Sequence, residues 1–301
     1  MTYTPATGAY DYGDLSLRES LWGQIRDLDP LELYVTSNAG TVDVTQKIHA
    51  WVIDPISSTS SQSGTMEFAD TTFAATNPSL RYNTTQIIEK GIAVSASDQN
   101  SKHAGFSDRF AREQLKKMKE WKQQLEFSAV AGVMVTGTGT TATGRTMAGI
   151  WSFASLTSTL GSGASLTSDM LNAYLGNAWN AGGEHDTVLV GRVLKERISA
   201  FVTGGNTKNI DAKDAEVVGR VDVYDSDHGR VKIVKHRYVN YISESLQQSM
   251  LTYISDYIRV GFLDEPHYEE RARTGYYKAG AIVGEATVQV DNSNAVQAVR
   301  V

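Results

Sequence analysis

The sequence contains no cysteine in its 301 residues. Without a thiol the chain can form no disulfide framework, no cysteine-based metal site and no thiol-dependent catalytic centre. Proteins that assemble in a reducing cytoplasm need none of these, and the composition is consistent with that compartment.

Long apolar runs are missing as well. The longest, at residues 127–135, reads FSAVAGVMV, whereas a helix that crosses a bilayer needs about 20 apolar residues. The first residues, MTYTPATGAYDYGDLS, have neither a basic start nor an apolar centre and are unlike a signal peptide. We therefore expect neither a membrane span nor a secretion signal.

The chain also lacks an excess of basic residues. Lys and Arg number 28 against 34 Asp and Glu, a formal net charge of −6, whereas a nucleic-acid reader is expected to show a basic stripe. Residues 1–100 hold 12 acidic and 5 basic side chains, and residues 101–301 hold 22 and 23. We hypothesise that acidic front segments lie on neutral or basic parts of a neighbouring copy.

The bulk composition is that of a folded protein. Hydrophobic residues make up 41% and charged residues 21% of the chain, which is close to the average of globular domains and predicts a real core. The length suits one large domain or two ordinary ones.

A long polar segment near the front is the most unusual feature. Residues 55–79, PISSTSSQSGTMEFADTTFAATNPS, include eleven Ser or Thr, and connections this long are uncommon in compact domains unless they are functional or disordered. Alternation at residues 41–54 and β-branched residues at 81–97 predict a strand on each side. If these strands pair, the segment is the tip of a long hairpin that projects from the body.

The clearest helix is expected at residues 107–134, with Ser107 or Asp108 as its N-terminal cap. Its apolar residues recur at steps of three and four, which predicts a scaffold helix laid across a sheet. Further helices are expected at 165–183 and 192–202. Strands are expected at 186–191, at 219–236 as a hairpin turning at 227–229, at 249–263, and at 281–290 with Ile282, Gly284, Ala286, Val288 and Val290 on one face.

No arrangement of residues indicates an active site. The segment GTTATGRT, from Gly139 to Thr146, matches the phosphate-binding loop except that Arg145 replaces the lysine. It follows a predicted helix rather than a strand, so a surface loop is the simpler interpretation.

The histidines form no H-x-x-x-H pair, DVYDSDHG lacks the calcium-loop spacing, and GGEHD lies at a predicted turn. We expect no enzyme activity, no bound metal and no cofactor, and self-assembly is the natural interpretation of the extended segments.

Several segments, taken in order, resemble the major head (capsid) proteins of tailed bacteriophages, in particular the group typified by the SU10 major head protein. The most distinctive is LNAYLGNAWNAGGEHDTVLVG at residues 171–191, followed by ISAFV. The others are HAWVID at 49–54, NTTQIIEKGIAVSAS at 83–97, the helix at 110–133, MAGIWSF at 147–153, ARTG at 272–275 and GEATVQVDNSNA at 284–295.

The resemblance implies an α+β chain with the HK97-type capsid fold. It implies a virion protein that is made in the host cytoplasm and self-assembles through hexamers and pentamers into the icosahedral shell around the phage genome. The implied parts are an N-terminal arm at 1–40, an extended E-loop β-hairpin at 41–96, a peripheral (P) domain at 97–155 and 263–301 with its spine helix at 107–134, and a mixed α/β axial (A) domain at 156–262.

The residues expected to matter fall into two groups. Contacts between subunits are expected on the arm and the hairpin, and the spine helix is expected to carry one apolar stripe. The first group is Trp22, Met66, Phe68, Phe73 and Tyr82, and the second is Leu115, Met118, Trp121 and Leu125.

The resemblance also implies partners. Because Met1 lies only about 40 residues before the hairpin, we expect a separate scaffolding protein rather than a cleaved N-terminal scaffold segment. A portal and a decoration protein are further expected partners, and packaged DNA is expected to make only non-specific contact. Two alternatives stay open: an encapsulin-like compartment shell, and a nucleotide-binding enzyme that uses residues 139–146.

Overall fold

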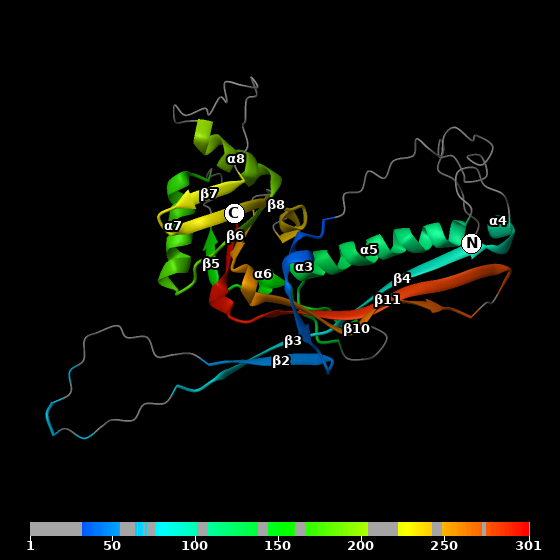
Figure 1. The fold of residues 1–301 in the computed structure, drawn as a ribbon, viewed down its shortest axis with the longest axis horizontal. Coiled ribbons are helices and arrows are strands. Elements are labelled where there is room, and N and C mark those ends of the chain that lie inside the picture. The colour runs from blue at the N-terminus through cyan, green and yellow to red at the C-terminus, as the bar shows by residue number, and fades with distance from the viewer. Residues whose placement is uncertain are drawn as a thin grey trace.

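The chain folds around two β-sheets, and a two-stranded ribbon runs out from them (Figure 1). The computed structural model describes residues 32–54, 64, 66–68, 70, 76–100, 108–137, 144–159, 166–203, 222–242, 249–272 and 275–300. Every statement on structure below concerns these residues.

The first sheet has four strands in the order β1-β10-β11-β4. Strand β1 runs parallel to β10, and the other neighbours are antiparallel. The strands are β1 (Gly40–Asp43), β10 (Ile258–Glu270), β11 (Tyr277–Val290) and β4 (Gln86–Ser95).

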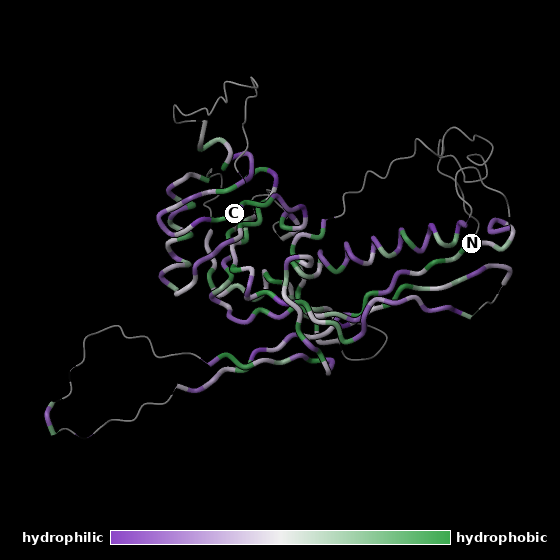
Figure 2. Tube along the Cα trace, in the orientation of Figure 1, coloured by the Kyte–Doolittle hydropathy of each residue, from purple (hydrophilic) through white to green (hydrophobic). Residues whose placement is uncertain are grey.

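Helix α5 (Arg109–Ala131) lies along one face of this sheet, as the sequence predicts for the scaffold helix, with ends a few residues inside the expected bounds. The side chain of Asp108 accepts a hydrogen bond of 3.1 Å from the amide of Ala111 and so caps the first turn. Figure 2 shows hydrophilic residues along much of the helix and hydrophobic residues on the strands beside it. The helix therefore covers the sheet with one apolar side only.

Strand β11 presents the predicted apolar face to α5. Trp121 is 1% exposed, donates its indole N–H to the carbonyl of Ile88 at 2.9 Å, and stacks on Phe262. Gly284 makes room for this ring, because a Cβ there would lie 2.7 Å from Trp121 Cζ2. The buried residues of the face are those that alternation predicts, namely Ile282, Gly284, Ala286, Val288 and Val290.

The second sheet has six strands in the order β5-β12-β9-β6-β8-β7. Helices α7 (Ser168–Asn180) and α8 (Arg192–Thr203) pack against it (Figure 1). The strands are β5 (Leu156–Thr159), β12 (Val296–Arg300), β9 (Met250–Tyr253), β6 (Thr187–Val190), β8 (Gly229–Lys235) and β7 (Val223–Ser226).

The remaining elements are short. Strands β2 (Ile48–Ile53) and β3 (Ser79–Thr84) form the ribbon. The single-turn elements are α3 (Tyr34–Asn38), α4 (Ala96–Asn100), α6 (Ile150–Phe153), η1 (Tyr238–Ile242), η2 (Ser255–Tyr257) and η3 (Ser293–Ala295).

The buried carboxylate of Glu126 joins three of these parts. Its Oε1 accepts hydrogen bonds from the amide of Val35 at 2.7 Å and from His236 Nε2 at 3.0 Å, and its Oε2 accepts one from the amide of Thr36 at 2.8 Å. The side chains of Glu126 and His236 are fully buried. A buried charge is tolerated only with such partners, so Glu126 ties α3 and the chain after β8 to the helix α5.

Three sequence-based predictions need correction. Residues 41–54 are two strands, since β1 joins the four-stranded sheet and only β2 belongs to the ribbon. Residues 81–97 likewise divide into β3, which belongs to the ribbon, and β4, which belongs to the four-stranded sheet. Residues 249–263 divide into β9 in the six-stranded sheet and β10 in the four-stranded sheet. In each case partners far away in sequence decide which sheet a strand joins.

The expected domain boundaries also differ from the sheets. Residues 263–301 were assigned to the part that contains α5, yet β12 pairs with β5 and β9 in the six-stranded sheet. Residues 258–262 were assigned to the other part, yet they begin β10 and pair with β1 and β11. The chain therefore crosses between the two sheets before β10 and again after β11.

We expect Trp121→Ala to lower the free energy of unfolding by about 3–5 kcal/mol, because it removes a buried indole and leaves a cavity under α5. Chemical denaturation of the unassembled chain, followed by circular dichroism, measures this change. Trp179→Ala is the matched control, since Trp179 is 56% exposed on α7 and its loss should change stability by no more than about 0.5 kcal/mol. Equal effects of the two substitutions would contradict this account of the core.

Candidate assembly surfaces

The β2–β3 ribbon has one face that nothing in the described part of the chain covers. In its antiparallel register Val52 lies opposite Leu80, and Ala50 lies opposite Tyr82, so these side chains share a face. The exposed fractions of the large side chains on this face are Ile48 54%, Val52 63%, Leu80 65% and Tyr82 46%. A contiguous exposed apolar strip of this kind marks an interaction surface.

The opposite face of the ribbon rests on the body. The ring of Trp51 lies 5.7 Å from that of Phe153 between centroids, and His49 Nε2 lies 2.6 Å from Gln289 Oε1 on β11. One face of the ribbon thus contacts the body, and the other is uncovered in the part of the chain that the structure describes.

A polar clamp fixes the point where the ribbon leaves the sheet. Asn83 is fully buried, and its amide donates hydrogen bonds to the carbonyls of Val288 at 2.7 Å and Ala148 at 3.0 Å. Its oxygen accepts one from the amide of Ala148 at 2.9 Å. Thr84 donates through Oγ1 to the carbonyl of Thr146 at 2.8 Å. The ribbon therefore starts from a rigid base.

The neighbouring contacts extend this clamp. Thr85 donates to Glu285 on β11, and Arg145 binds the same carboxylate at 2.7 Å. Thr287 donates through Oγ1 to the carbonyl of Thr84 at 3.1 Å. These contacts lie on the face of β11 that is turned away from α5, because they come from the alternate residues of the strand.

Near the tip of the ribbon, Met66 and Phe68 are 84% and 105% exposed. They therefore contribute almost nothing to the core of their own subunit. Trp22 and Phe73, which were also expected to make contacts between subunits, lie outside the described residues.

The apolar stripe of α5 includes three of the four expected residues. Trp121 and Leu125 are buried, and Met118 packs against the same core. Leu115 is 69% exposed and does not belong to the stripe. Six residues separate it from Trp121, which is about 120° around an α-helix, so it points away from the sheet.

The solvent side of α5 is basic. Lys116, Lys119 and Lys122 are exposed, and Lys116 lies 3.7 Å from Glu113 while Lys117 binds Glu120 at 2.7 Å. Because ion pairs between exposed side chains are weak, the lysines on this side of the helix can leave these glutamates and pair with acidic groups of a neighbouring molecule.

The outer edge of β10 is acidic. Strand β1 pairs with β10 only as far as Phe262, and no described strand pairs with that edge beyond it. His267 lies 3.5 Å from Asp264 and 3.4 Å from Glu269. Its pKa is raised by the hydrogen bond to the carbonyl of Glu265 and by these two carboxylates. Charged residues and a proline, Pro266, protect such an edge from non-specific strand pairing.

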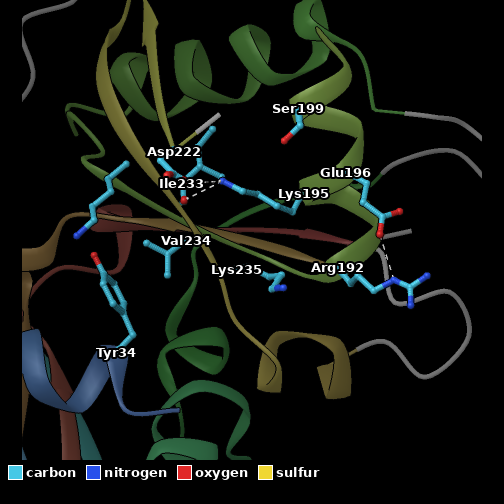
Figure 3. A pocket seen from close by; sticks show the side chains of 10 residues that line it. Tyr34, Arg192, Lys195, Glu196, Ser199, Asp222, Ile233, Val234 and Lys235 are labelled. Carbon is cyan, nitrogen blue, oxygen red and sulfur yellow. Dashed lines mark hydrogen bonds and ion pairs between the residues drawn. The ribbon is translucent and has the colours of Figure 1, made fainter. Parts of the chain in front are cut away.

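A hollow of about 700 Å³ lies between α8, β8 and α3 (Figure 3). Its cationic side chains are largely engaged: Lys195 binds Asp222 at 3.2 Å, and Arg192 binds Glu196 at 3.2 Å. Lys232 lies over the ring of Tyr34, 5.0 Å from its centroid. No histidine lines this hollow in the described residues, so no nucleophile with an adjacent imidazole base is assembled there.

The described part of the candidate phosphate-binding loop does not form one. Arg145 pairs with Glu285, and Thr146 makes a β-bridge with Val135. A phosphate loop leads directly into a helix, whereas α6 begins only at Ile150 and spans four residues. Residues 139–143 of this segment lie outside the described residues.

The GGEHD segment is structural. His185 is buried, and its ring nitrogens lie 2.7 Å from Thr252 Oγ1 and 3.3 Å from the carbonyl of Asn294. Burial lowers the pKa of His185. Asp186 accepts hydrogen bonds from the amide and hydroxyl of Ser255. His185 and Asp186 thus connect the start of β6 with β9 and with the chain that follows it.

Two further classes of site are absent from the described residues. None of the helices there is long and apolar enough to cross a membrane. No group of three or more His, Asp or Glu side chains lies close enough there to hold a metal ion.

Solved structures with a similar fold include chains from phages and from the capsid of a GTA particle. A chain from Gordonia phage Cozz matches with a TM-score of 0.56 at 12% identity, covering 100% of this chain and 98% of that one. A chain from phage G major capsid and decoration proteins matches at 0.57 and 10% identity, covering 92% and 91%. A chain from the capsid of a native GTA particle matches at 0.62 and 10%, covering 91% and 92%. The fold is therefore of the HK97-like capsid class.

The sequence identifies the family of the chain, which the fold alone does not. A family model described as the SU10 major capsid protein matches residues 2–301, so the chain belongs to the SU10 major capsid protein family. It is a major capsid protein of a phage head and a component of the virion. No curated protein sequence matches it. The resemblance seen in the ordered segments is thus confirmed.

We expect Asn83→Ala to lower the free energy of unfolding by about 1–3 kcal/mol, because it removes the hydrogen bonds of the Asn83 side chain to four backbone groups: the carbonyls of Val288 and Ala148 and the amides of Ala148 and Thr84. Hydrogen exchange should speed up at Thr84 and Ala148 first. Asn177→Ala is the control, since Asn177 is exposed on α7 and its exchange pattern should match the unmodified chain. Unchanged exchange at Thr84 in the Asn83 variant would show that the clamp does not hold the ribbon.

Proposed function

We propose that the chain assembles through hexamers and pentamers into an icosahedral head, and that the β2–β3 ribbon is the main connection between neighbouring subunits. The observation that carries this proposal is the uncovered apolar face of the ribbon, with Val52 and Leu80 more than 60% exposed. A soluble chain that leaves such a strip open gains most when a second copy covers it.

The parts of the fold take the following roles in this proposal. The ribbon between residues 48 and 84 is the E-loop, α5 with the four-stranded sheet is the P-domain, and the six-stranded sheet with α7 and α8 is the A-domain. Strand β12 then belongs to the A-domain, because it pairs with β5 and β9. Residues 1–31 are the N-terminal arm.

The energetics favour many modest contacts. Full burial of one large apolar side chain contributes at most about 1.5–3 kcal/mol, and association must first offset the loss of rotational and translational freedom. One ribbon therefore binds weakly. A closed symmetric shell repeats the contact around every subunit, and the sum becomes large.

The charged surfaces supply orientation. The basic side of α5 and the acidic edge of β10 are complementary, so two copies can place one against the other. Like-charged faces repel and disfavour wrong arrangements. The exposed lysines of α5 also suit non-specific contact with packaged DNA, whose phosphates bind cations without reading sequence.

The proposal assigns no catalysis to the chain. A separate scaffolding protein, a portal and a decoration protein are the proposed partners beyond the shell subunits themselves. Their contacts would use surfaces that assembly leaves open.

A charge placed on the apolar face should prevent assembly without unfolding the subunit. Leu80→Asp puts a carboxylate into the proposed contact, where its desolvation is costly. We expect a folded chain with an unchanged denaturation midpoint and no shells or capsomers in negative-stain micrographs. The unmodified chain, expressed in the same way, should form them.

Ser79→Asp is the matched control for this test. Ser79 is the neighbouring residue and lies opposite Ile53 on the other face of the ribbon, so the same charge should be tolerated. Normal shells from the Leu80 variant would refute the proposed role of the apolar face. Loss of shells in both variants would mean that any added charge disrupts the ribbon.

Removal of the tip provides a second test. Deleting residues 57–75 removes Met66, Phe68 and Phe73, which we propose pack mainly on an adjacent subunit. The variant should remain folded, because Met66 and Phe68 are exposed in the free chain. It should sediment as a monomer where the unmodified chain forms shells, and normal shells from this variant would rule out the assignment.

A further inference from the structure

The outer edge of strand β4 is unpaired along its whole length in the described part of the chain. β4 is the last strand of the four-stranded sheet and pairs with β11 in an unbroken register. The amide of Ala96 donates to the carbonyl of Tyr276, the next pair along this register. Hydrogen-bonded pairs alternate in an antiparallel ladder, so the even-numbered residues of β4 bond to β11. The odd-numbered residues turn their backbone groups outward, and they are Ile87, Glu89, Gly91, Ala93 and Ser95.

This edge lacks the usual protection against strand pairing. Natural edges are commonly blunted by proline, by bulges or by charges, as the β10 edge is by Pro266 and its register shifts. β4 contains no proline and no register shift. The single charged residue among the five that point outward, Glu89, is paired with Arg271 at 2.9 Å. A long, regular edge of this kind can accept an additional strand.

Gly91, in the middle of the edge, has no role within the described part of its own subunit. A glycine inside a strand often marks a place where another backbone approaches closely. At Gly261, Gly280 and Gly284 the neighbour belongs to the same chain, because an added Cβ would lie within 3 Å of it. A Cβ at Gly91 would meet no described atom within 4 Å, and its φ angle is not positive. The space beside Gly91 is therefore open to a second molecule.

A hollow of about 290 Å³ lies between this edge and α5. It is lined by residues 91–94 of β4 and by Arg109, Glu113 and Lys117 of α5. Because charges of both signs line it, the hollow does not select a partner by its charge. Recognition here rests on backbone hydrogen bonds and on the sizes of the side chains that alternate along the added strand.

The β2–β3 ribbon of a second copy has a suitable edge. The amide of Thr85 donates to the carbonyl of Lys47, the next pair along the register of the ribbon. By the same alternation, Leu80 and Tyr82 turn their backbone groups away from β2. No described strand pairs with that side of β3. The side chains of Leu80 and Tyr82 are 65% and 46% exposed, so this edge carries large residues that have room for a partner.

A second β4 edge is a poorer donor. Helix α5 packs on β4, where Trp121 bonds to the carbonyl of Ile88. Paired strands lie about 4.8 Å apart, whereas packed helices need about 8–10 Å between their axes. Two β4 edges paired with each other would therefore crowd their two α5 helices. The outer part of the ribbon projects away from α5 (Figure 1) and avoids this crowding.

We propose that β3 of a second copy adds to the β4 edge as an antiparallel fifth strand, with Tyr82 opposite Gly91 and Leu80 opposite Ala93. Each large side chain of the ribbon then lies opposite a small residue of β4. An aromatic ring over an edge glycine supplies the packing that the glycine lacks. This inference rests on the proposed role of the ribbon in assembly, and it adds the surface of the neighbour that receives the ribbon.

The absence of cysteine makes a direct test possible. The full-length chain with both Leu80→Cys and Ala93→Cys is assembled into shells and treated with a short bis-maleimide. Opposite residues have Cβ atoms about 4.5–5.5 Å apart, so we expect a ladder of covalent oligomers on a denaturing gel. β3 and β4 extend in opposite directions from residue 85 (Figure 1), so the ladder reports links between copies.

Leu80→Cys with Ala173→Cys is the matched control. Ala173 is exposed on α7 and takes the same substitution as Ala93, and its ladder should be at least about tenfold weaker. Shells of the first variant that give no ladder, or equal ladders from the two variants, would overturn the strand pairing. Either result would leave the role of the ribbon in assembly intact, since that role is tested separately by Leu80→Asp.

Hydrogen exchange separates strand pairing from mere contact. The amides of Gly91 and Ala93 should exchange more slowly in shells than in the unassembled chain, because they gain partners. The amide of Ile92, which already bonds to β11, should change little. Equal exchange of Gly91 in the two states would rule out the added strand even if the cross-links form.

A substitution at the glycine tests the predicted register. Gly91→Val should not lower the denaturation midpoint of the unassembled chain, because valine suits a strand and its side chain meets open space. It should lower the yield of shells at least about fivefold, because it fills the space of the Tyr82 ring. Thr157→Val, on the exposed face of β5, is the control and should change neither quantity. A normal yield from the Gly91 variant would contradict the proposal.

Discussion

Strand β11 is the constraint on which the rest of the structure depends. Its side chains alternate between two faces, as in any β-strand. One face, from Ile282 to Val290, forms the core beneath α5, and the other carries Glu285, Thr287 and Gln289. These three polar residues contact Thr85, Thr84 and His49 at the base of the ribbon. A single strand therefore builds the body and fixes the direction of the hairpin that projects from it.

The part of the ribbon that is held rigidly and the part that is exposed are different segments. Hydrogen bonds at Asn83 hold the ribbon where it leaves the sheet, while the apolar face further out is not covered by any of the described residues. Because buried polar networks have demanding geometry, they specify one orientation. The apolar strip is not directional and can accept slightly different placements of a neighbour. A shell whose subunits occupy similar but not identical positions needs both properties.

Local sequence patterns predicted the helices and strands well. Which strands pair with one another depends on residues far apart in the sequence, and the local patterns did not predict it. The alternation of β11 and the cap at Asp108 were visible because each depends on neighbouring residues. Leu115 was wrongly included in the apolar stripe, because residues at steps of three and four can fall on two neighbouring rows along a helix. Only packing against the sheet shows that the buried row is the one that contains Trp121. The breaks within residues 41–54 and 249–263, and the placement of β12, depend on strand partners far away in the sequence, such as Arg259 for Gly40, and one sequence holds no signal for such pairs. Composition singled out the tip of the ribbon, where Met66 and Phe68 are exposed, and their role in assembly is a proposal. The Asn83 clamp was missed, because a single asparagine in a strand has no distinguishing pattern.

The lack of cysteine has a consequence for the shell. No disulfide can join subunits of this chain, because it contains no cysteine. The contacts proposed for the exposed strip of the ribbon and for the charged faces of α5 and β10 are non-covalent, and each is modest because association also has entropic and desolvation costs. Modest contacts allow a misplaced subunit to leave before its neighbours close around it. Once the shell is complete, a subunit can leave only if all of its contacts break together, and the same weak interactions then hold it firmly.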